Sequence, residues 1–283
     1  MTVTNTVTAE LSYVSLPSDG SQPLRYLTKP PEGVPVTNYK EVKHLVPVEN
    51  VRGQEDKFTL DTSGFQFSLN QPTKVKTFTD DKEVEEKYYP ESVEVIKKAT
   101  GASKVFIFDH TVRRRIEGEA GIEDPKRRGP AATVHVDQTP SAAVSRAHRY
   151  FASLGNEEEA ERLLKKRFQI INLWRPITHP ADDRPLALCD FRSTNPEEDL
   201  VRVELVFPER DGETYGVVWN PGHQWKYLKG MKLDEVILIK CYDSVREEGI
   251  ATMTPHTAFA DPSTPEGSPP RESIELRALV FYE

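Results

Sequence analysis

The stretch that decides the fold begins with FQIINLWRP, residues 168–176. Further runs rich in apolar, β-branched and aromatic residues follow it, at 186–191, 201–207, 215–219, 236–242, 253–259 and 274–282. Clusters of Pro, Gly, Asp and Asn separate these runs, and runs bounded in this way are typical of strands. Many short strands after a few helices favour a jelly roll or another β-barrel over a sheet of βαβ units.

The chain before residue 168 adds a few strands and helices to this pattern. Residues 104–110 (KVFIFDH) and 131–137 (AATVHVD) are predicted to be strands. Helical spacing predicts one helix over 81–100 and two more between 140 and 166. The chain is therefore expected to be mainly β, with flanking helices.

We expect residues 1–283 to form one domain. The length of 283 residues would allow two domains, but one β-barrel can take roughly 200–250 residues. Residues 1–50 are polar and rich in Pro and Gly, which predicts an extended arm that lies on the body of the protein. The β core is expected over about 100–283, with a helical insertion at 140–166.

Charge and composition argue against several classes of protein. There are 37 Lys and Arg against 45 Asp and Glu, a net charge of −8, whereas a binder of nucleic acid or anionic membranes needs a basic face. No apolar run is long enough to span a bilayer, and the first residues do not resemble a signal peptide. Two cysteines are too few for a disulfide framework, which favours the reducing cytoplasm.

The spacing His135-Val136-Asp137 is the first feature that suggests chemistry. Residues i and i+2 of a strand point to the same face, so the imidazole and the carboxylate converge. They supply two of the three ligands of a 2-His-1-carboxylate iron site. About one such His-x-acid pair is expected by chance among 7 histidines and 45 acidic residues, and for the pair alone a core histidine beside a solvated aspartate is the favoured explanation.

Residues later in the sequence favour the iron site over the structural interpretation. His256 lies late in the β-rich half, and Arg271 and Ser273 stand at the start of the last predicted strand. The order fits a ferrous iron and 2-oxoglutarate oxygenase on a double-stranded β-helix. Two imidazoles and one carboxylate leave three adjacent positions on iron, two for 2-oxoglutarate and one for O2. A buried arginine and a serine hydroxyl suit the distal carboxylate of 2-oxoglutarate.

At this point the chain resembles the fungal asaB hydroxylase/desaturase family, which includes gibberellin desaturase-like enzymes and is related to components of cephamycin 7α-methoxylase. The matching stretches cover about residues 50–283: HTVRR (110–114), VHVDQT (134–139), NLWRP (172–176), HQWKY (223–227) with Met231 and Asp234-Glu235, KCYDS (240–244), PHTAF (255–259) and PRESIELRALVF (270–281). The resemblance implies a non-haem Fe(II), 2-oxoglutarate and O2-dependent oxidation of a small substrate in fungal secondary metabolism.

On this resemblance, His135, Asp137 and His256 become the iron ligands and the catalytic residues. Arg271, with Ser273, is the first candidate to bind 2-oxoglutarate, and Arg277 is its rival. Both arginines have the same parity on the last strand, so either can face inward. The spacing after His256 favours Arg271.

Several residues have both a functional and a structural interpretation. Asn172 and Trp174 share a strand face and either border the iron pocket, where Asn172 could bind 2-oxoglutarate, or pack in the core. Arg175 lies on the other face and either contacts substrate or bridges to an acid. Trp225 and Tyr227 either stack on a substrate or fill the barrel.

Two cationic positions are also open. Lys240 lies in the middle of a predicted strand and needs a partner, which is Glu235, Asp243 or an anionic ligand. Arg113, in a cluster that runs to Arg115, either clamps a substrate carboxylate or belongs to a solvated face.

The sequence thus favours hydroxylation, desaturation or oxidative ring closure at an unactivated C–H bond of a metabolite or an amino-acid-derived substrate, with release of succinate and CO2. A non-catalytic accessory subunit of a methoxylase-like complex is one alternative. A zinc-dependent hydrolase or a metal-free β-barrel binding module is another. We expect a small-molecule substrate and neither nucleic acid nor membrane as a partner; the oligomeric state stays open, with a homodimer among the alternatives.

Overall fold

The strands form two sheets in the computed structural model, which describes residues 5–114, 131–207 and 211–283. The smaller sheet has the order β4-β12-β7-β14-β5, formed by β4 (Phe65–Ser68), β12 (Val236–Asp243), β7 (Phe168–Pro176), β14 (Glu272–Phe281) and β5 (Lys104–Arg114). The larger sheet has the order β1-β3-β11-β8-β13-β6-β10-β9-β2. Its inner strands are β11 (Trp225–Tyr227), β8 (Leu186–Cys189), β13 (His256–Ala258) and β6 (His135–Val136).

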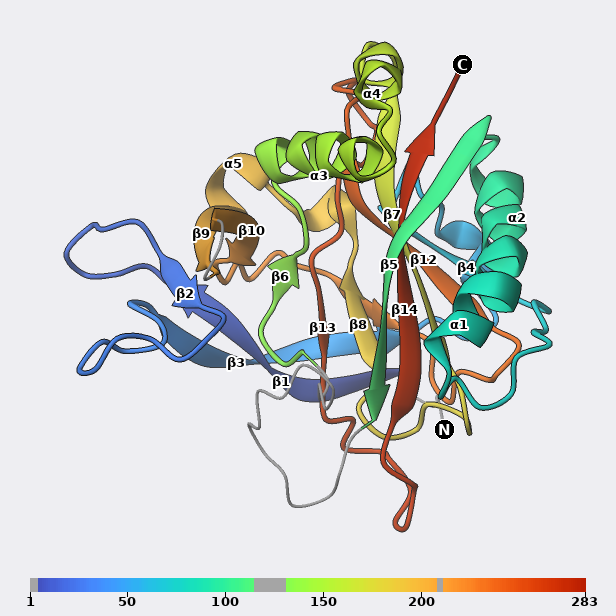
Figure 1. Ribbon diagram of the computed structural model, residues 1–283. Helices are drawn as coiled ribbons and strands as arrows, with labels where there is room; N and C mark the ends of the chain where they lie inside the picture. The colour runs from blue at the N-terminus through green and yellow to red at the C-terminus, as the bar shows by residue number, and fades with distance from the viewer. Residues whose placement is uncertain (1–4, 115–130, 208–210) are drawn as a thin grey trace.

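The chain winds between the two sheets as a double-stranded β-helix (Figure 1). It passes from β5 to β6, back to β7, and then to β8 and β11 in the larger sheet, before β12, β13 and β14 alternate again. The strand orders β5-β14-β7-β12 and β6-β13-β8-β11 result from this winding. The expected mainly β, jelly-roll fold is confirmed.

Strands at both ends enlarge the second sheet beyond this core. In the part of the chain expected to be an arm, β1 (Thr6–Ser15) pairs with β3 (Lys40–Asn50), and β3 runs parallel to β11. Alternate burial of Ala9, Leu11 and Tyr13 explains why this segment is a strand. At the other end, β9 (Leu200–Val206) and β10 (Asp211–Val217) form a hairpin on β6, and β2 (Leu24–Tyr26) pairs with β9.

Helices cover the smaller sheet and one end of the barrel (Figure 1). They are α1 (Asp81–Glu83), which continues through the π-helical η2 (Val84–Tyr88) into α2 (Tyr89–Thr100), then α3 (Pro140–Ser153), α4 (Glu157–Leu163) and α5 (Pro196–Asp199), with single 3-10 turns η1 (Glu55–Lys57) and η3 (Phe191–Ser193). Gly101 ends α2 with a φ of 70°, a left-handed conformation that suits glycine. Within the described residues, no helix is both long and apolar enough to cross a membrane.

The side chains of β14 alternate between two hydrophobic clusters, and this alternation positions the site. Leu276 and Val280 pack with Ile96 of α2 on the outer side of the sheet, whereas Leu279 and Phe281 belong to the cluster between the sheets. Residues 273, 275 and 277 have the parity of the inner pair, so the polar end of this face points into the barrel.

Candidate metal centre

Two imidazoles lie side by side where β6 and β13 pair. His135 and His256 stand directly opposite each other in the antiparallel register. Directly opposite residues place their side chains on the same face of a sheet, close together. The ring centroids are 4.4 Å apart as a result. Strand pairing alone therefore unites two histidines that lie far apart in the sequence.

The carboxylate of Asp137 completes the group. Its Oδ1 lies 3.2 Å from Nε2 of His135 and 3.9 Å from Nε2 of His256, and the three potential ligand atoms all lie within 4.8 Å of one another. The side chain of His256 is 3% exposed, against 24% for His135 and 15% for Asp137, so the group opens toward solvent on one side. The structure thus brings together the three residues predicted to ligate iron.

Backbone carbonyls orient both imidazoles for metal binding. Nδ1 of His135 donates to the carbonyl oxygen of Thr133 at 2.8 Å, and Nδ1 of His256 donates to that of Thr254 at 3.0 Å. These bonds place a proton on Nδ1 of each ring and turn Nε2, the atom that would ligate a metal in place of its own proton, toward Asp137. The donor set and its orientation fit a divalent metal ion of the iron or zinc type.

The acid–base properties of the three residues reflect their proximity. Burial acts to raise the pKa of Asp137, but the hydrogen bond from His135 and the charge of His256 hold it well below its usual range. Burial acts to lower the pKa of His135, yet its bond to Asp137 raises it overall. Burial and the charge of His135 lower the pKa of His256. A deprotonated Asp137 and a neutral His256 are the forms that bind a cation.

The second oxygen of Asp137 is held from the opposite sheet. Nδ2 of Asn172, on β7, donates to Oδ2 of Asp137 at 2.6 Å. Arg277 follows from β14, with its Nε 3.7 Å from the same oxygen, and its guanidinium also bonds Glu275 at 2.6 Å and Asp109 at 3.1 Å. Arg277 is therefore surrounded by three carboxylates and orients one of them.

Arg271 lies on the same inner face but in different surroundings. It is 2% exposed, its Nη1 donates to the carbonyl oxygen of Arg184 at 2.6 Å, and its guanidinium stacks on Trp174 at 5.4 Å. No carboxylate pairs with its side chain in the described residues, and neither its Nε nor the hydroxyl of Ser273 has a hydrogen-bond partner there. Burial and the charge of Arg113 lower the pKa of Arg271 to about 9.

A cleft of about 400 Å³ opens beside Asp137. Helix α3 lines it with Ser141, Arg146 and Arg149, and the β9–β10 hairpin lines it with Arg202 and Glu213 among others. Because a metal ligand forms part of its wall, a molecule in this cleft would lie next to the metal centre.

Other predicted site residues do not reach this centre. Trp225 and Tyr227 are buried on the far face of the larger sheet, where the indole nitrogen donates to the hydroxyl of Tyr13 at 2.8 Å and the tyrosine hydroxyl donates to Asp261 at 3.1 Å. The substrate-stacking role is therefore wrong, and their core role is confirmed. Both faces of the strand are covered by protein, so aromatic content does not identify the pocket face.

Lys240 is a structural cation. Its ammonium, which has three N–H groups, bonds Asp61 at 2.8 Å, Asp243 at 2.9 Å and the carbonyl oxygen of Ala251 at 2.9 Å. No donor is left for a ligand, so the substrate role is wrong. Of the three alternatives left open by the sequence, Glu235, Asp243 or an anionic ligand, the structure shows the pair with Asp243.

Arg175 and Arg113, the two remaining candidates for substrate contact, have different surroundings. Arg175 points to the outer face of β7, where its guanidinium stacks on Tyr88 at 5.2 Å, so it does not contact the metal pocket. Arg113 pairs with Ser273 in the β5–β14 register, and its charge acts on Arg271. Arg115 is outside the described residues.

Some residues at the centre carried no role in the sequence interpretation. Cys241, expected only as core, places Sγ 3.9 Å from Oδ2 of Asp137, and Glu275 bridges Asn172 and Arg277. The parity of Glu275 on β14 was a usable signal. The spacing of Arg146 and Arg149 by three residues on a helix would also have indicated a cationic face.

Comparisons with known proteins agree with this geometry. The family model YDMC, described as an oxidoreductase/YMDC permease-like domain, matches residues 11–281. The chain is 38% identical to hydroxylase/desaturase efuI of Hormonema carpetanum, over 98% of this chain and 96% of the relative. It is 44% identical to hydroxylase/desaturase asaB of Aspergillus flavus over 138 residues, 44% of this chain and 60% of the relative.

Comparison with a solved structure shows that the fold is similar as well as the sequence. The iron and alpha-ketoglutarate-dependent endoperoxidase NvfI superposes with a TM-score of 0.85 at 32% identity, covering 98% of both chains. Its sequence relative nvfI of Aspergillus novofumigatus, an Fe(II)/2-oxoglutarate-dependent dioxygenase, is 34% identical over 96% of this chain and 96% of the relative. The chain therefore belongs to the hydroxylase/desaturase family of Fe(II)/2-oxoglutarate-dependent dioxygenases.

Proposed function

We propose that the protein oxidises an unactivated C–H bond of a small secondary metabolite, with Fe(II), 2-oxoglutarate and O2 as cofactor and cosubstrates. Membership in this family supports the choice of cofactor and of enzyme class. The convergence of His135, Asp137 and His256 indicates where in the protein the reaction takes place. Bound iron and 2-oxoglutarate would supply the oxidising power with O2, and 2-oxoglutarate would leave as succinate and CO2.

Arg271 and Ser273 would bind the distal carboxylate of 2-oxoglutarate. The support is a buried guanidinium without a carboxylate partner in the described residues, beside a buried hydroxyl without a hydrogen-bond partner. A carboxylate placed there would satisfy both donors with charge-assisted hydrogen bonds. Arg277 is a poorer candidate because Glu275, Asp109 and Asp137 already compensate its charge.

Asn172 and Arg277 would act as positioning residues for the metal. They hold Oδ2 of Asp137, which keeps Oδ1 turned toward the two imidazoles. Groups that orient a ligating carboxylate in this way tune metal affinity. Trp174 would form the floor on which Arg271 lies. Arg113 would add positive charge at that end of the pocket, through its effect on Arg271.

The substrate would enter the cleft between α3 and the β9–β10 hairpin. This cleft borders Asp137 and is lined by both charged and apolar groups, including Arg146 and Leu205. Its side chains would hold one C–H bond close to the metal and exclude water, which decides between hydroxylation, desaturation and ring closure. We also propose that the protein works in a reducing compartment, because both cysteines are free and buried.

The experiment is an anaerobic titration of metal-free protein with ferrous iron and then 2-oxoglutarate. A weak charge-transfer band at about 500 nm would report bidentate 2-oxoglutarate on a 2-His-1-carboxylate iron. Succinate release with candidate metabolites would then identify substrates. Absence of the band in folded, iron-loaded protein would contradict the proposed function.

The same titration tests the alternatives. A zinc hydrolase would use the His135, Asp137 and His256 group but would have no need of Arg271 and Ser273. It would be active with zinc and without 2-oxoglutarate. An accessory subunit would release no succinate by itself under any of these conditions.

A further inference from the structure

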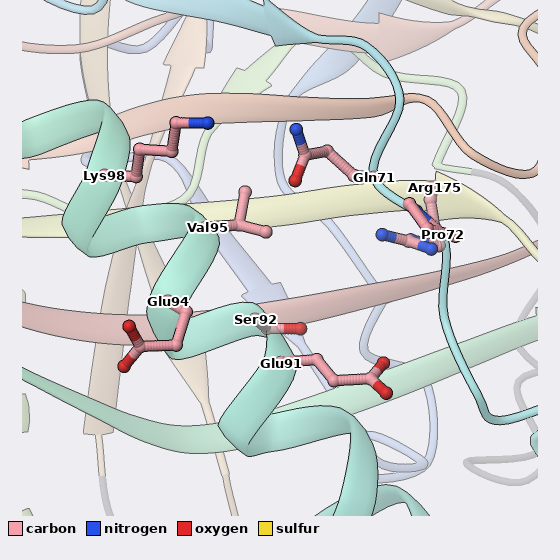
Figure 2. Close-up of a pocket in the computed structure, with 8 residues that line it drawn as sticks. All are labelled: Gln71, Pro72, Glu91, Ser92, Glu94, Val95, Lys98 and Arg175. Carbon is pink, nitrogen blue, oxygen red and sulfur yellow. The ribbon is translucent and has the colours of Figure 1, made fainter.

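A second cavity, of about 280 Å³, lies on the outer side of the smaller sheet (Figure 2). It is bordered by α2, by the loop that follows β4 and by β7, which contributes Arg175. Trp174, the preceding residue of β7, faces the interior of the barrel, so this cavity and the metal centre lie on opposite faces of one strand.

The charge of Arg175 is buried here with few partners. Arg175 is 2% exposed and makes one hydrogen bond, from Nη1 to the carbonyl oxygen of Leu233 at 3.3 Å. In the described ranges no carboxylate forms an ion pair with it, and its Nε has no hydrogen-bond partner. A buried cation without compensation is costly, so an anion in the adjoining cavity would stabilise it.

Two buried hydroxyls beside Arg175 are also unsatisfied. Ser92 is 1% exposed and lines the cavity, and the ring of Tyr88 contacts the guanidinium. Neither hydroxyl makes a hydrogen bond of good geometry among the described residues, although Ser92 and Arg175 lie close enough to Tyr88 to act against the rise in its pKa. Burial raises the pKa of Tyr88, while the charge of Arg175 acts in the opposite direction. Each hydroxyl can donate one hydrogen bond, as can the guanidinium Nε.

The two acidic residues of the lining, Glu91 and Glu94, make no ion pair with Arg175 in the described part of the chain. The carboxylate of Glu91 accepts hydrogen bonds from Thr73 Oγ1 at 2.7 Å and from the backbone N–H of Lys74 at 3.2 Å. Glu94 and Lys98 also line the cavity, and both are exposed to solvent. The buried residues of the lining therefore offer one fixed positive charge, from Arg175, and one hydroxyl donor, from Ser92.

We propose that this cavity binds a small oxyanion, a carboxylate or a phosphate, through Arg175 and Ser92, with Lys98 at the entrance. The anion would accept from the guanidinium Nε and the serine hydroxyl and would compensate the buried charge. This ligand is separate from 2-oxoglutarate, because the strand β7 lies between the two arginines and their side chains project from different faces.

The test is isothermal titration calorimetry of the full-length protein with sodium phosphate and, separately, sodium acetate, at constant ionic strength. Wild-type protein should bind one equivalent of at least one of these anions at Arg175, in addition to any anion bound at Arg271, and the preferred anion distinguishes the two ligand classes. Arg175→Gln should abolish the binding. Ser92→Ala should weaken it about fivefold, the effect of losing one hydrogen bond.

Two controls locate the binding and guard against unfolding. Arg271→Gln should retain one equivalent of phosphate bound at Arg175, because Arg271 belongs to the metal pocket and its removal affects only an anion bound there. Lys98→Gln changes an exposed residue, so a weaker affinity in this variant does not arise from misfolding. The proposal is overturned if wild-type protein binds neither anion, if Arg175→Gln and Ser92→Ala both bind phosphate as tightly as wild type, or if Arg271→Gln abolishes phosphate binding.

Discussion

Arg271, which is buried just before β14, and Arg277, which is partly exposed on β14, share the inner face of the sheet and yet have opposite electrostatic surroundings. Arg277 has three carboxylates around its guanidinium, from Asp109, Glu275 and Asp137. Arg271 has a tryptophan ring, a backbone carbonyl and the positive charge of Arg113. The first arginine is part of a compensated network, whereas the second needs an anion.

This difference shows how one residue type can serve two purposes in one pocket. A compensated arginine fixes the position of a neighbouring carboxylate, and its removal leaves that carboxylate as an uncompensated charge in the empty protein. An uncompensated one costs stability until its ligand arrives, and it then binds that ligand strongly. The following experiments separate the two purposes, in order of decreasing expected effect.

Asp137→Ala should reduce succinate release to background and abolish stable binding of ferrous iron. The carboxylate is the group on which His135, His256 and the Arg277 network converge, so its loss leaves two imidazoles without their anionic partner. Iron content after desalting and succinate release measure the effect. Asp109→Asn, which changes another carboxylate beside Arg277, should retain iron; equal iron loss in both variants would remove Asp137 from the ligand set.

Arg271→Gln should raise the dissociation constant for 2-oxoglutarate by about 100-fold or more, because one partner of a buried charge pair is removed. Iron affinity should stay unchanged. Anaerobic titration of the iron-loaded variant measures both quantities. Arg271→Lys keeps the charge but not the bidentate geometry, so its dissociation constant for 2-oxoglutarate should lie between those of wild type and Arg271→Gln. A larger loss of affinity in Arg277→Gln would transfer the role to Arg277.

Arg277→Gln should lower the free energy of unfolding by about 3 kcal/mol, because it leaves Glu275 as a buried charge without its partner. Arg271→Gln should change it by less than about 1 kcal/mol, since the charge that it removes has no carboxylate partner in the described residues. Urea unfolding without iron and 2-oxoglutarate gives both values. Similar losses in the two variants would show that the surroundings of the arginines do not differ in energy.

Ser273→Ala should weaken 2-oxoglutarate binding about fivefold, the effect of one hydroxyl hydrogen bond. The hydroxyl is buried beside Arg271 and has no partner in the described part of the chain. The same anaerobic titration measures the change. Ser268→Ala, in the exposed loop before β14, is the matched control; an unchanged affinity in Ser273→Ala would leave Arg271 as the sole anchor.

The sequence predicted those parts of the site that depend on the two-residue period of a strand. This period placed His135 and Asp137 on one face and gave Arg271 and Arg277 the same orientation, and the structure agrees on both. It did not reveal the charge around each arginine. The three carboxylates beside Arg277 come from β5, β14 and the residue after β6, and only the fold brings them together.

The residues that sequence reasoning misplaced lie on strands that protein covers on both sides. Trp225 and Tyr227 are both buried, so hydrophobicity could not tell which face of their strand borders the pocket, whereas the predicted orientation of Arg175 away from Trp174 is confirmed. Lys240 shows a related limit. A lysine within an apolar run indicates a buried partner, but Asp61 is contributed by a distant segment and becomes visible only in the folded chain.

Because His135 and His256 are paired across β6 and β13, the ability to bind a metal depends on how these two strands are aligned. Strand β6 has two residues and β13 has three, so one register position joins the two ligands. A slip by one residue would turn an imidazole to the far face and leave a site with one histidine. Iron retention therefore depends on the alignment of β6 with β13. Molecules with the wrong register lack one of the two histidine ligands, and a measurement of bound iron distinguishes them from correctly folded ones.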